Sequence, residues 1–241
     1  MVTTATPWVG NTADKLYLQS GQFSATIKTS RSINSIDNTS RGISWDGINT
    51  PWSGLQADKL YLQSGQFSGT LKTSRTMTSV DPGVNAVSWD GNDSPWMGGS
   101  TDKLYLQSGQ FSATIKTSQN IGSIEAFNVG ISYDGTNTPW CGFNDDKLYL
   151  QSGQFSATLK TSRSVGGVDA TATGVSWDGA NTPWCGSAAN KLYLTSGQFS
   201  ATLKTSRSVN SIDTEPEDID TDDVISRLGI ASFIPRVAGI I

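Results

Sequence analysis

Residues 7–24 read PWVGNTADKLYLQSGQFS, and close copies of this stretch begin at Pro51, Pro95, Pro139 and Pro183. Successive copies start 44 residues apart each time, and no copy has gained or lost a net residue between its landmarks. A fixed period of this length is typical of a protein in which one structural unit is repeated along the chain.

A second landmark, S-W-D-G, lies between the copies and obeys the same period. Its aromatic residue is Trp45, Trp89 and Trp177, and the third of the four occurrences has Tyr133 instead. All eight Trp residues of the chain fall either here or in the P-W dipeptide. This register indicates one structural unit present five times rather than an irregular aromatic core.

Within each unit the residue pattern favours short strands separated by turns. Period-two alternation, β-prone residues and turn signals such as Asp46-Gly47 define the segments. In the first unit the predicted strands span residues 15–19, 23–27, 32–36 and 42–45. We expect Leu16, Leu18, Phe23, Ala25 and Ile27, with their copies, to form the core between blades. We expect the P-W dipeptides to lie beside loops.

Four antiparallel strands in 44 residues, repeated five times, predict an all-β, five-bladed β-propeller over residues 1–213. A linear solenoid is the competing architecture. Solenoid repeats are shorter, roughly 20–30 residues in the β-containing types, and they need distinct end caps. The sequence has neither feature, so we expect a closed ring of four-stranded blades.

The motifs S-W-D-G, S-G and T-I/L-K resemble the blades of WD-type propellers over residues 7–213. The resemblance implies the blade architecture and not that family's partners. Here the W-D pair lies in a predicted turn, and a chain without His cannot form that family's His–Asp network. The size and number of repeats are also similar to small five-bladed lectin propellers, and S-W-D-G-x-N-T-P-W strings resemble virus-associated sequences.

The strand of the I-S-W-D-G type occurs only four times, so the first blade needs a strand from elsewhere. We expect the tail, residues 214–241, to supply it through Val224, Ile225, Ser226 and Leu228. The acidic residues before this segment would then form an exposed linker, because an unpaired buried carboxylate is costly. The alternative is that residues 224–241 form an arm that docks on a protein partner.

The charges of the chain exclude several classes of function. Of 17 basic and 21 acidic residues, the tail from Thr214 holds two and six, so the repeats carry no net charge. A neutral body argues against a nucleic-acid partner, since a basic face supplies most of that affinity. The absence of His excludes His-based triads and His metal ligands, and two Cys residues cannot complete a usual zinc site.

Cofactors, metals and membranes are likewise not indicated. No run of 18 apolar residues is present, so we expect no transmembrane helix. The first ten residues lack the basic and apolar regions of a classical signal peptide. The sequence leaves the localisation open, with association with a virion as one reading, and we expect no cofactor and no metal.

The candidate ligand-binding residues are an aromatic residue and a polar residue in each repeated loop. Aromatic faces stack on sugar rings, and Asn or Asp side chains bind hydroxyl groups. The candidates are Trp8, Trp52, Trp96, Trp140 and Trp184, together with Asn49, Asp93, Asn137 and Asn181. The alternative is that each Trp packs between neighbouring blades, as any repeat protein requires.

Repetition of the candidate residues argues against an enzyme, because catalysis needs unlike groups that converge at one site. The Asp residues of the D-G turns are explained by the hydrogen bonds that an Asp side chain makes to the backbone of a turn, without a catalytic role. We therefore expect a non-enzymatic, multivalent binding module that recognises glycans or a cell-surface ligand in a lectin-like way. The alternatives are an assembly component, such as a phage or virus virion or tail protein, and a designed repeat propeller.

Overall fold

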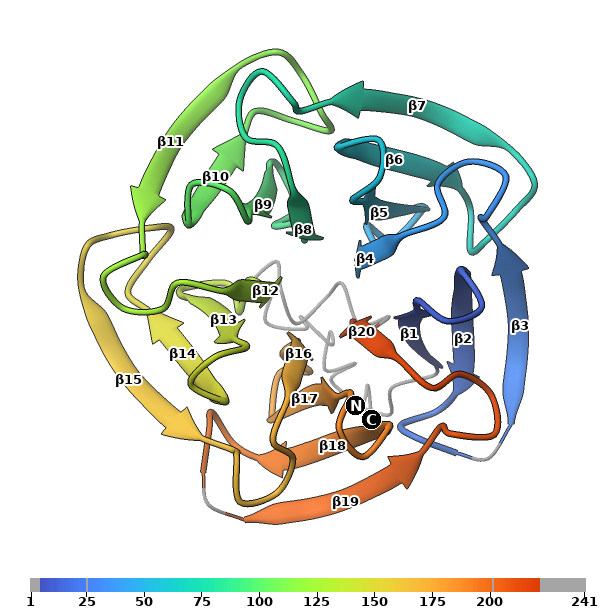
Figure 1. The fold of residues 1–241 in the computed structure, drawn as a ribbon, viewed down its shortest axis with the longest axis vertical. Helices are drawn as coiled ribbons and strands as arrows, with labels where there is room; N and C mark the ends of the chain where they lie inside the picture. Colours follow the sequence, from blue (N-terminus) through green and yellow to red (C-terminus); the bar gives the residue numbers. More distant parts are fainter. Residues whose placement is uncertain (1–4, 25, 201, 222–241) are drawn as a thin grey trace, which may run out of the picture.

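The computed structural model describes residues 5–24, 26–200 and 202–221, and these form five four-stranded antiparallel sheets arranged in a ring (Figure 1). The predicted five-bladed β-propeller is confirmed. The described residues contain no helix, so none of them forms a helix that could cross a membrane.

The four strands of each blade lie side by side, from the innermost strand at the centre of the ring to the outermost strand at its rim (Figure 1). The innermost strands are β20 (Pro216–Ile219), β4 (Ser40–Ile43), β8 (Val84–Val87), β12 (Asn128–Ile131) and β16 (Ala172–Val175). The second strands are β1 (Ala5–Gly10), β5 (Asn49–Gly54), β9 (Ser94–Gly98), β13 (Thr138–Gly142) and β17 (Asn181–Gly186). The third strands are β2 (Lys15–Ser20), β6 (Lys59–Ser64), β10 (Lys103–Gln107), β14 (Lys147–Gln151) and β18 (Lys191–Ser196). The outermost strands are β3 (Ile27–Ser32), β7 (Leu71–Thr76), β11 (Ile115–Asn120), β15 (Leu159–Ser164) and β19 (Leu203–Ser208).

The P-W dipeptide lies within the second strand of each blade and not beside a loop. All residues of β1 are buried, because β20 and β2 pair with its two edges and the neighbouring blades pack on its two faces. The predicted strand at 23–27 is also wrong in part. Phe23 adopts the left-handed φ of 63°, which places its ring in the core and delays the outermost strand to Ile27. Residues 34–36, expected to be in a strand, form a turn.

The apolar core lies between neighbouring blades. In one such cluster, Leu16 and Leu18 of the first blade pack with Trp52, Tyr61 and Phe67 of the second. The expected Leu and Phe positions are therefore core positions, and Ile27 is partly buried against the core. The prediction is wrong for the Ala25 position, because its copies Gly69, Ala113 and Ala157 are exposed, while Ala25 itself lies outside the described residues. Burial of each large apolar side chain contributes about 1.5–3 kcal/mol, so the cohesion of the ring comes mainly from these contacts between blades.

The first blade is completed by both ends of the chain. Strand β20 pairs antiparallel with β1, with Trp8 opposite Ile219 and Val9 opposite Asp218. The predicted ring closure is confirmed, but the segment that provides it is different. Val224, Ile225, Ser226 and Leu228, and the docking arm 224–241, lie outside the described residues.

The prediction that the acidic segment, residues 215–223, is an exposed loop is wrong for residues 216–221, which are buried, whereas Glu215 is exposed and residues 222 and 223 lie outside the described part. Glu217, Asp218 and Asp220 have 6%, 0% and 2% of their surface exposed. They are tolerated because each carboxylate has partners on neighbouring strands. Arg41 pairs with Glu217 at 2.7 Å, and the backbone N–H of Ile43 donates to Asp218 at 3.0 Å.

Asp220 joins two other inner strands to the closing strand. Its carboxylate accepts hydrogen bonds from the hydroxyls of Ser44 at 3.1 Å and Ser176 at 2.8 Å, and from the N–H of Trp45 at 2.7 Å. A buried charge is costly only when these partners are missing. The acidic residues therefore act as specific connections across the centre of the ring.

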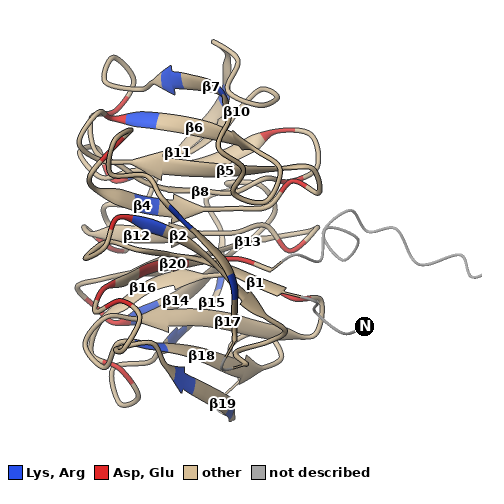
Figure 2. Cartoon of the chain, turned by 90° about the vertical axis from the view of Figure 1, so that its right-hand side faces the viewer, with Lys and Arg blue, Asp and Glu red and all other residues tan. Residues whose placement is uncertain are grey.

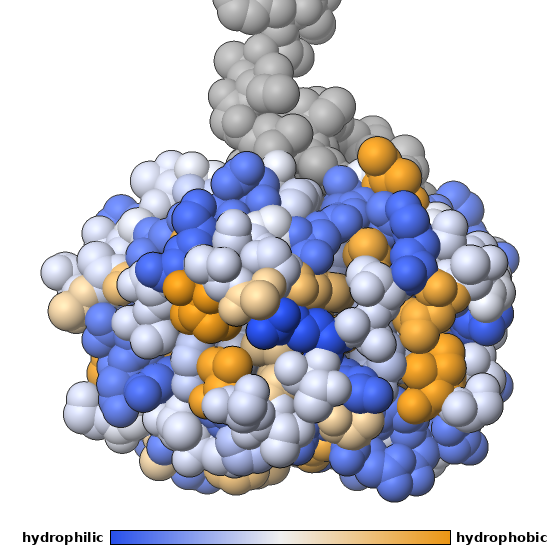
Figure 3. Space-filling view, turned by 90° about the horizontal axis from the view of Figure 1, so that it is seen from above, coloured by the Kyte–Doolittle hydropathy of each residue, from blue (hydrophilic) through white to orange (hydrophobic). Residues whose placement is uncertain are grey.

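The disc has two faces, which Figure 2 shows edge-on. The turn face carries the four D-G turns, which join the innermost strand to the second strand in the second to fifth blades. The start face carries the loops after each P-W-x-G and the first residues of the innermost strands. The side of the disc in Figure 3 is largely hydrophilic, with small separate apolar patches, as expected for a surface without a large apolar contact.

Candidate functional site

The five P-W indoles belong to the core, because each has at most 1% of its surface exposed. Each stacks on the Tyr directly opposite on the third strand, with ring centroids 4.0–4.2 Å apart. The expectation that these indoles line exposed binding loops is contradicted, since they present no face to a ligand. The residues concerned are Trp8, Trp52, Trp96, Trp140 and Trp184.

The polar candidates lie on the turn face, where their side chains are already hydrogen-bonded or ion-paired to neighbouring protein groups. Asn49 donates to the carboxylate of Asp46 within its own turn, and Asn137 and Asn181 repeat this bond with their own turn Asp. Asp93 is different, because it pairs with Lys116 at 2.7 Å. Burial alone would raise the pKa of Asp93, but hydrogen bonds from Lys116 and from the Gly109 N–H hold it below its usual value.

A cleft of about 370 Å³ opens beside these residues, at the junction of the fourth and fifth blades. Asp134, Thr136 and Asn137 form its wall on the fourth blade. Trp177 and Gln198 form its wall on the fifth, and the Trp177 side chain is half-buried. The cleft therefore combines an accessible aromatic ring with carboxylate and amide groups.

The same arrangement recurs at other junctions between blades. A Gln from the turn before the outermost strand donates to the D-G carboxylate of the preceding blade. The pairs are Gln110–Asp46, Gln154–Asp90, Gln198–Asp134 and Gln22–Asp178. Four junctions thus share one set of polar contacts. The Asp at the matching position of the next copy is residue 222, outside the described residues.

The aromatic residue before the D-G turn of the fifth blade, Trp177, lines the cleft together with residues of the preceding blade. Burial and the carboxylates of Asp90 and Asp134 raise the pKa of the Tyr133 hydroxyl. The half-buried aromatic residues before the four D-G turns are Trp45, Trp89, Tyr133 and Trp177. Sequence reasoning noticed these aromatic residues but missed the Gln partners, although a Gln stands in every S-G-Q-F-S copy.

The described residues contain no cluster of three or more His, Cys, Asp or Glu side chains suited to a metal ion. Cys141 and Cys185 are buried free thiols, and burial raises their pKa well above the usual value. Such thiols are inert at neutral pH, because the reactive form is the thiolate. The cleft on the turn face presents hydrogen-bonding groups and one aromatic ring.

The sequence matches no protein-family model and no curated protein sequence. Its structure is similar to a chain of a nidogen/laminin complex, with a TM-score of 0.61 and 9% identity over 90% of this chain and 98% of that one. A glutaminyl cyclase of Myxococcus xanthus has a TM-score of 0.53 and 9% identity, over 75% and 69% of the two chains.

A virginiamycin B lyase from Staphylococcus aureus is also similar, with a TM-score of 0.54 and 11% identity over 90% and 76% of the two chains. At these identities the likeness shows the β-propeller fold alone. The similar structures include both enzymes and a protein of a binding complex, so the fold carries no specific function.

Proposed function

We propose that this propeller is a non-enzymatic, multivalent binding module whose turn-face clefts recognise glycans in a lectin-like way. The observation that carries the proposal is the repetition of the same Gln–Asp contact at four junctions between blades, one of which opens into the cleft beside Trp177. A set of equal sites suits a repeated ligand, whereas catalysis needs unlike groups at one unique site.

The side chains of the cleft have the complementary chemistry for a sugar. The half-buried Trp177 ring offers an apolar surface to the C–H face of a pyranose. The Asp134 carboxylate already accepts four hydrogen bonds within the protein and therefore fixes the position of the Gln198 amide. The carbonyl oxygen and the second N–H of that amide are the groups that can bind a hydroxyl group. Each site is shallow and weak, and the three sites with an aromatic ring add their affinities when the ligand is displayed on a surface.

The test begins with a glycan array of the intact chain, followed by titration calorimetry with the best monovalent glycan. We expect three similar sites per molecule, because the Gln–Asp pair has an aromatic residue in the next blade at three junctions, namely Trp89, Tyr133 and Trp177. Trp177→Ala should remove one site and leave the affinity of the remaining sites unchanged. Thr117→Ala, an exposed change on the outermost strand β11, is the matched control and should leave the stoichiometry unchanged.

Two outcomes would contradict the proposal. One is binding with a single site whose affinity does not respond to Trp177→Ala or to Gln154→Ala. The other is the absence of binding to every glycan class on the array by a chain whose folding is confirmed by circular dichroism. In either case the clefts would be packing features of the ring and not sites of recognition.

A further inference from the structure

The copies of the repeat are nearly identical in their framework but diverge on the start face. The second residue of the innermost strand differs in every copy, as does the residue after P-W-x-G. The first set is Arg41, Asn85, Val129, Thr173 and Glu217, and the second is Asn11, Leu55, Gly99, Phe143 and Ser187. The residue two before the first set has four identities in five copies: Thr39, Gly83, Phe127, Thr171 and Glu215.

Nine of these fifteen residues line one cleft of about 340 Å³ on the start face. Each of its lining residues belongs to one of the three divergent repeat positions. They include Arg41, Glu215, Glu217, Phe127, Phe143 and Asn11. A ring of equal blades would otherwise present equal residues here, so the divergence produces a site that occurs once per molecule.

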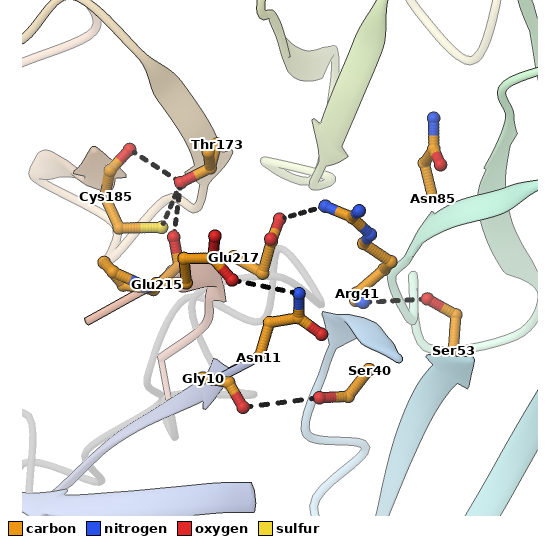
Figure 4. Close-up of polar contacts among 12 residues, drawn as sticks. Gly10, Asn11, Ser40, Arg41, Ser53, Asn85, Thr173, Cys185, Glu215 and Glu217 are labelled. Atoms are coloured by element: carbon orange, nitrogen blue, oxygen red, sulfur yellow. Dashed lines mark hydrogen bonds and ion pairs between the residues drawn. The ribbon is translucent and has the colours of Figure 1, made fainter. Parts of the chain in front are cut away.

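The polar side of the cleft is acidic. The Arg41 guanidinium of β4 forms an ion pair with the Glu217 carboxylate of β20, at 2.7 Å (Figure 4). Glu215 is exposed and accepts a hydrogen bond from the Asn11 amide at 3.2 Å. Within the described part of the chain, no Lys or Arg lies within 4 Å of Glu215. One carboxylate of the cleft therefore has no cation to neutralise it.

The apolar side of the cleft consists of two exposed aromatic rings. Phe127 and Phe143 keep 52% and 39% of their surface exposed, against buried Phe residues in the S-G-Q-F-S turns. Their ring centroids are 5.5 Å apart and their planes are tilted by 54°. Exposed aromatic faces beside a carboxylate attract organic cations through cation–π and charge-assisted hydrogen bonds.

We propose that this start-face cleft binds the basic side chain, Arg or Lys, of a protein partner, with one partner per propeller. The stem of the basic side chain packs on Phe127 and Phe143, and its cationic head reaches Glu215. The single-copy character of the cleft fits one asymmetric partner and not a repeated ligand. This proposal does not depend on the function proposed for the turn face.

The test uses Nα-acetyl-arginine methylamide as the probe, followed by ¹H–¹⁵N NMR of the intact chain. We expect saturable shifts for the amide signals of residues around the cleft, and a weaker effect at higher salt. Nα-acetyl-norleucine methylamide, which keeps the stem without the charge, should bind at least about fivefold more weakly. Glu215→Gln should weaken binding of the arginine probe by a similar factor.

Phe127→Ala tests the aromatic side, and Trp177→Ala on the turn face is the matched control. The first should weaken binding of the arginine probe, and the second should leave it unchanged. Amide spectra that retain the dispersion of the parent confirm that each variant is folded. Equal binding of the arginine and norleucine probes, no saturable binding of either, or unchanged affinity in Glu215→Gln would overturn the proposal.

Discussion

The glycine of P-W-x-G leaves space for a buried carboxylate in every copy of the repeat. A Cβ atom at Gly98 would lie within 3 Å of the Asp81 carboxylate. That carboxylate accepts hydrogen bonds from the Ser100 N–H and the Tyr105 hydroxyl, both at 3.1 Å. The buried acid can approach the strand only because the side chain of residue 98 is absent. The same crowding occurs at the matching glycine of every copy.

Substitution at this glycine should therefore be strongly destabilising. We expect Gly98→Ala to lower the free energy of unfolding by about 2–4 kcal/mol, because the rigid carboxylate must move and lose its partners. Urea denaturation followed by Trp fluorescence gives the value. Gly167→Ala is the control, since its Cβ would meet no atom within 4 Å, and its change should stay within about 0.5 kcal/mol. Equal effects of the two substitutions would refute this reading.

At the scale of elements, the sequence predicted which strand was missing but not which residues supply it. A search for the letters I-S-W-D-G points to residues after 223, whereas the 44-residue period points to Ile219, 44 residues after Val175. The acidic residues of β20 concealed the strand, because their partners lie far away in sequence. Asp218, for example, accepts from Ile43, 175 residues earlier.

The second strand escaped prediction for a related reason. A strand that is buried on both faces shows no alternation, and a Pro within it argues for a loop or an edge. The same ambiguity affected the candidate site, since repetition of a Trp fits packing as well as binding. The start-face cleft could have been found from the sequence, because the divergent positions are visible once the copies are aligned.

The closing strand should control the stability of the ring. Truncation after Asp213 removes β20, leaves β1 without its inner neighbour and exposes an unpaired edge, so we expect aggregation or strand exchange between molecules. Truncation after Asp223 keeps β20 and should retain the melting temperature of the intact chain. Light scattering and thermal denaturation of both chains test this. A monomeric, equally stable chain ending at Asp213 would show that β20 is dispensable.

At the scale of the molecule, one repeated framework supports two faces of different character. The turn face keeps the same Asp and Gln contacts at successive junctions, so its symmetry is retained. The start face places a different residue at the same position of each innermost strand, so its symmetry is lost. The framework between the two faces is the same in every blade. Its buried Trp–Tyr stacks and Tyr–carboxylate hydrogen bonds recur in all five.

These Tyr hydroxyls make the whole ring sensitive to alkaline pH. Burial and the neighbouring carboxylates raise the pKa of the third-strand Tyr residues, which are Tyr17, Tyr61, Tyr105, Tyr149 and Tyr193. An unfolded Tyr loses its proton near pH 10, so above that pH the folded chain holds more protons than the unfolded chain. Stability should therefore be retained below about pH 9 and fall above about pH 10.

Each of the five Tyr residues should contribute up to about 1 kcal/mol per pH unit to this fall. Denaturation midpoints between pH 7 and 11, with tyrosinate absorbance recorded in parallel, measure it. Tyr61→Phe keeps the stack on Trp52 but removes one titrating group, so its stability should decline less steeply above pH 10 than that of the parent chain. Tyrosinate absorbance that rises near pH 10 while the chain is still folded would show that the pKa of these hydroxyls is not raised in the folded chain.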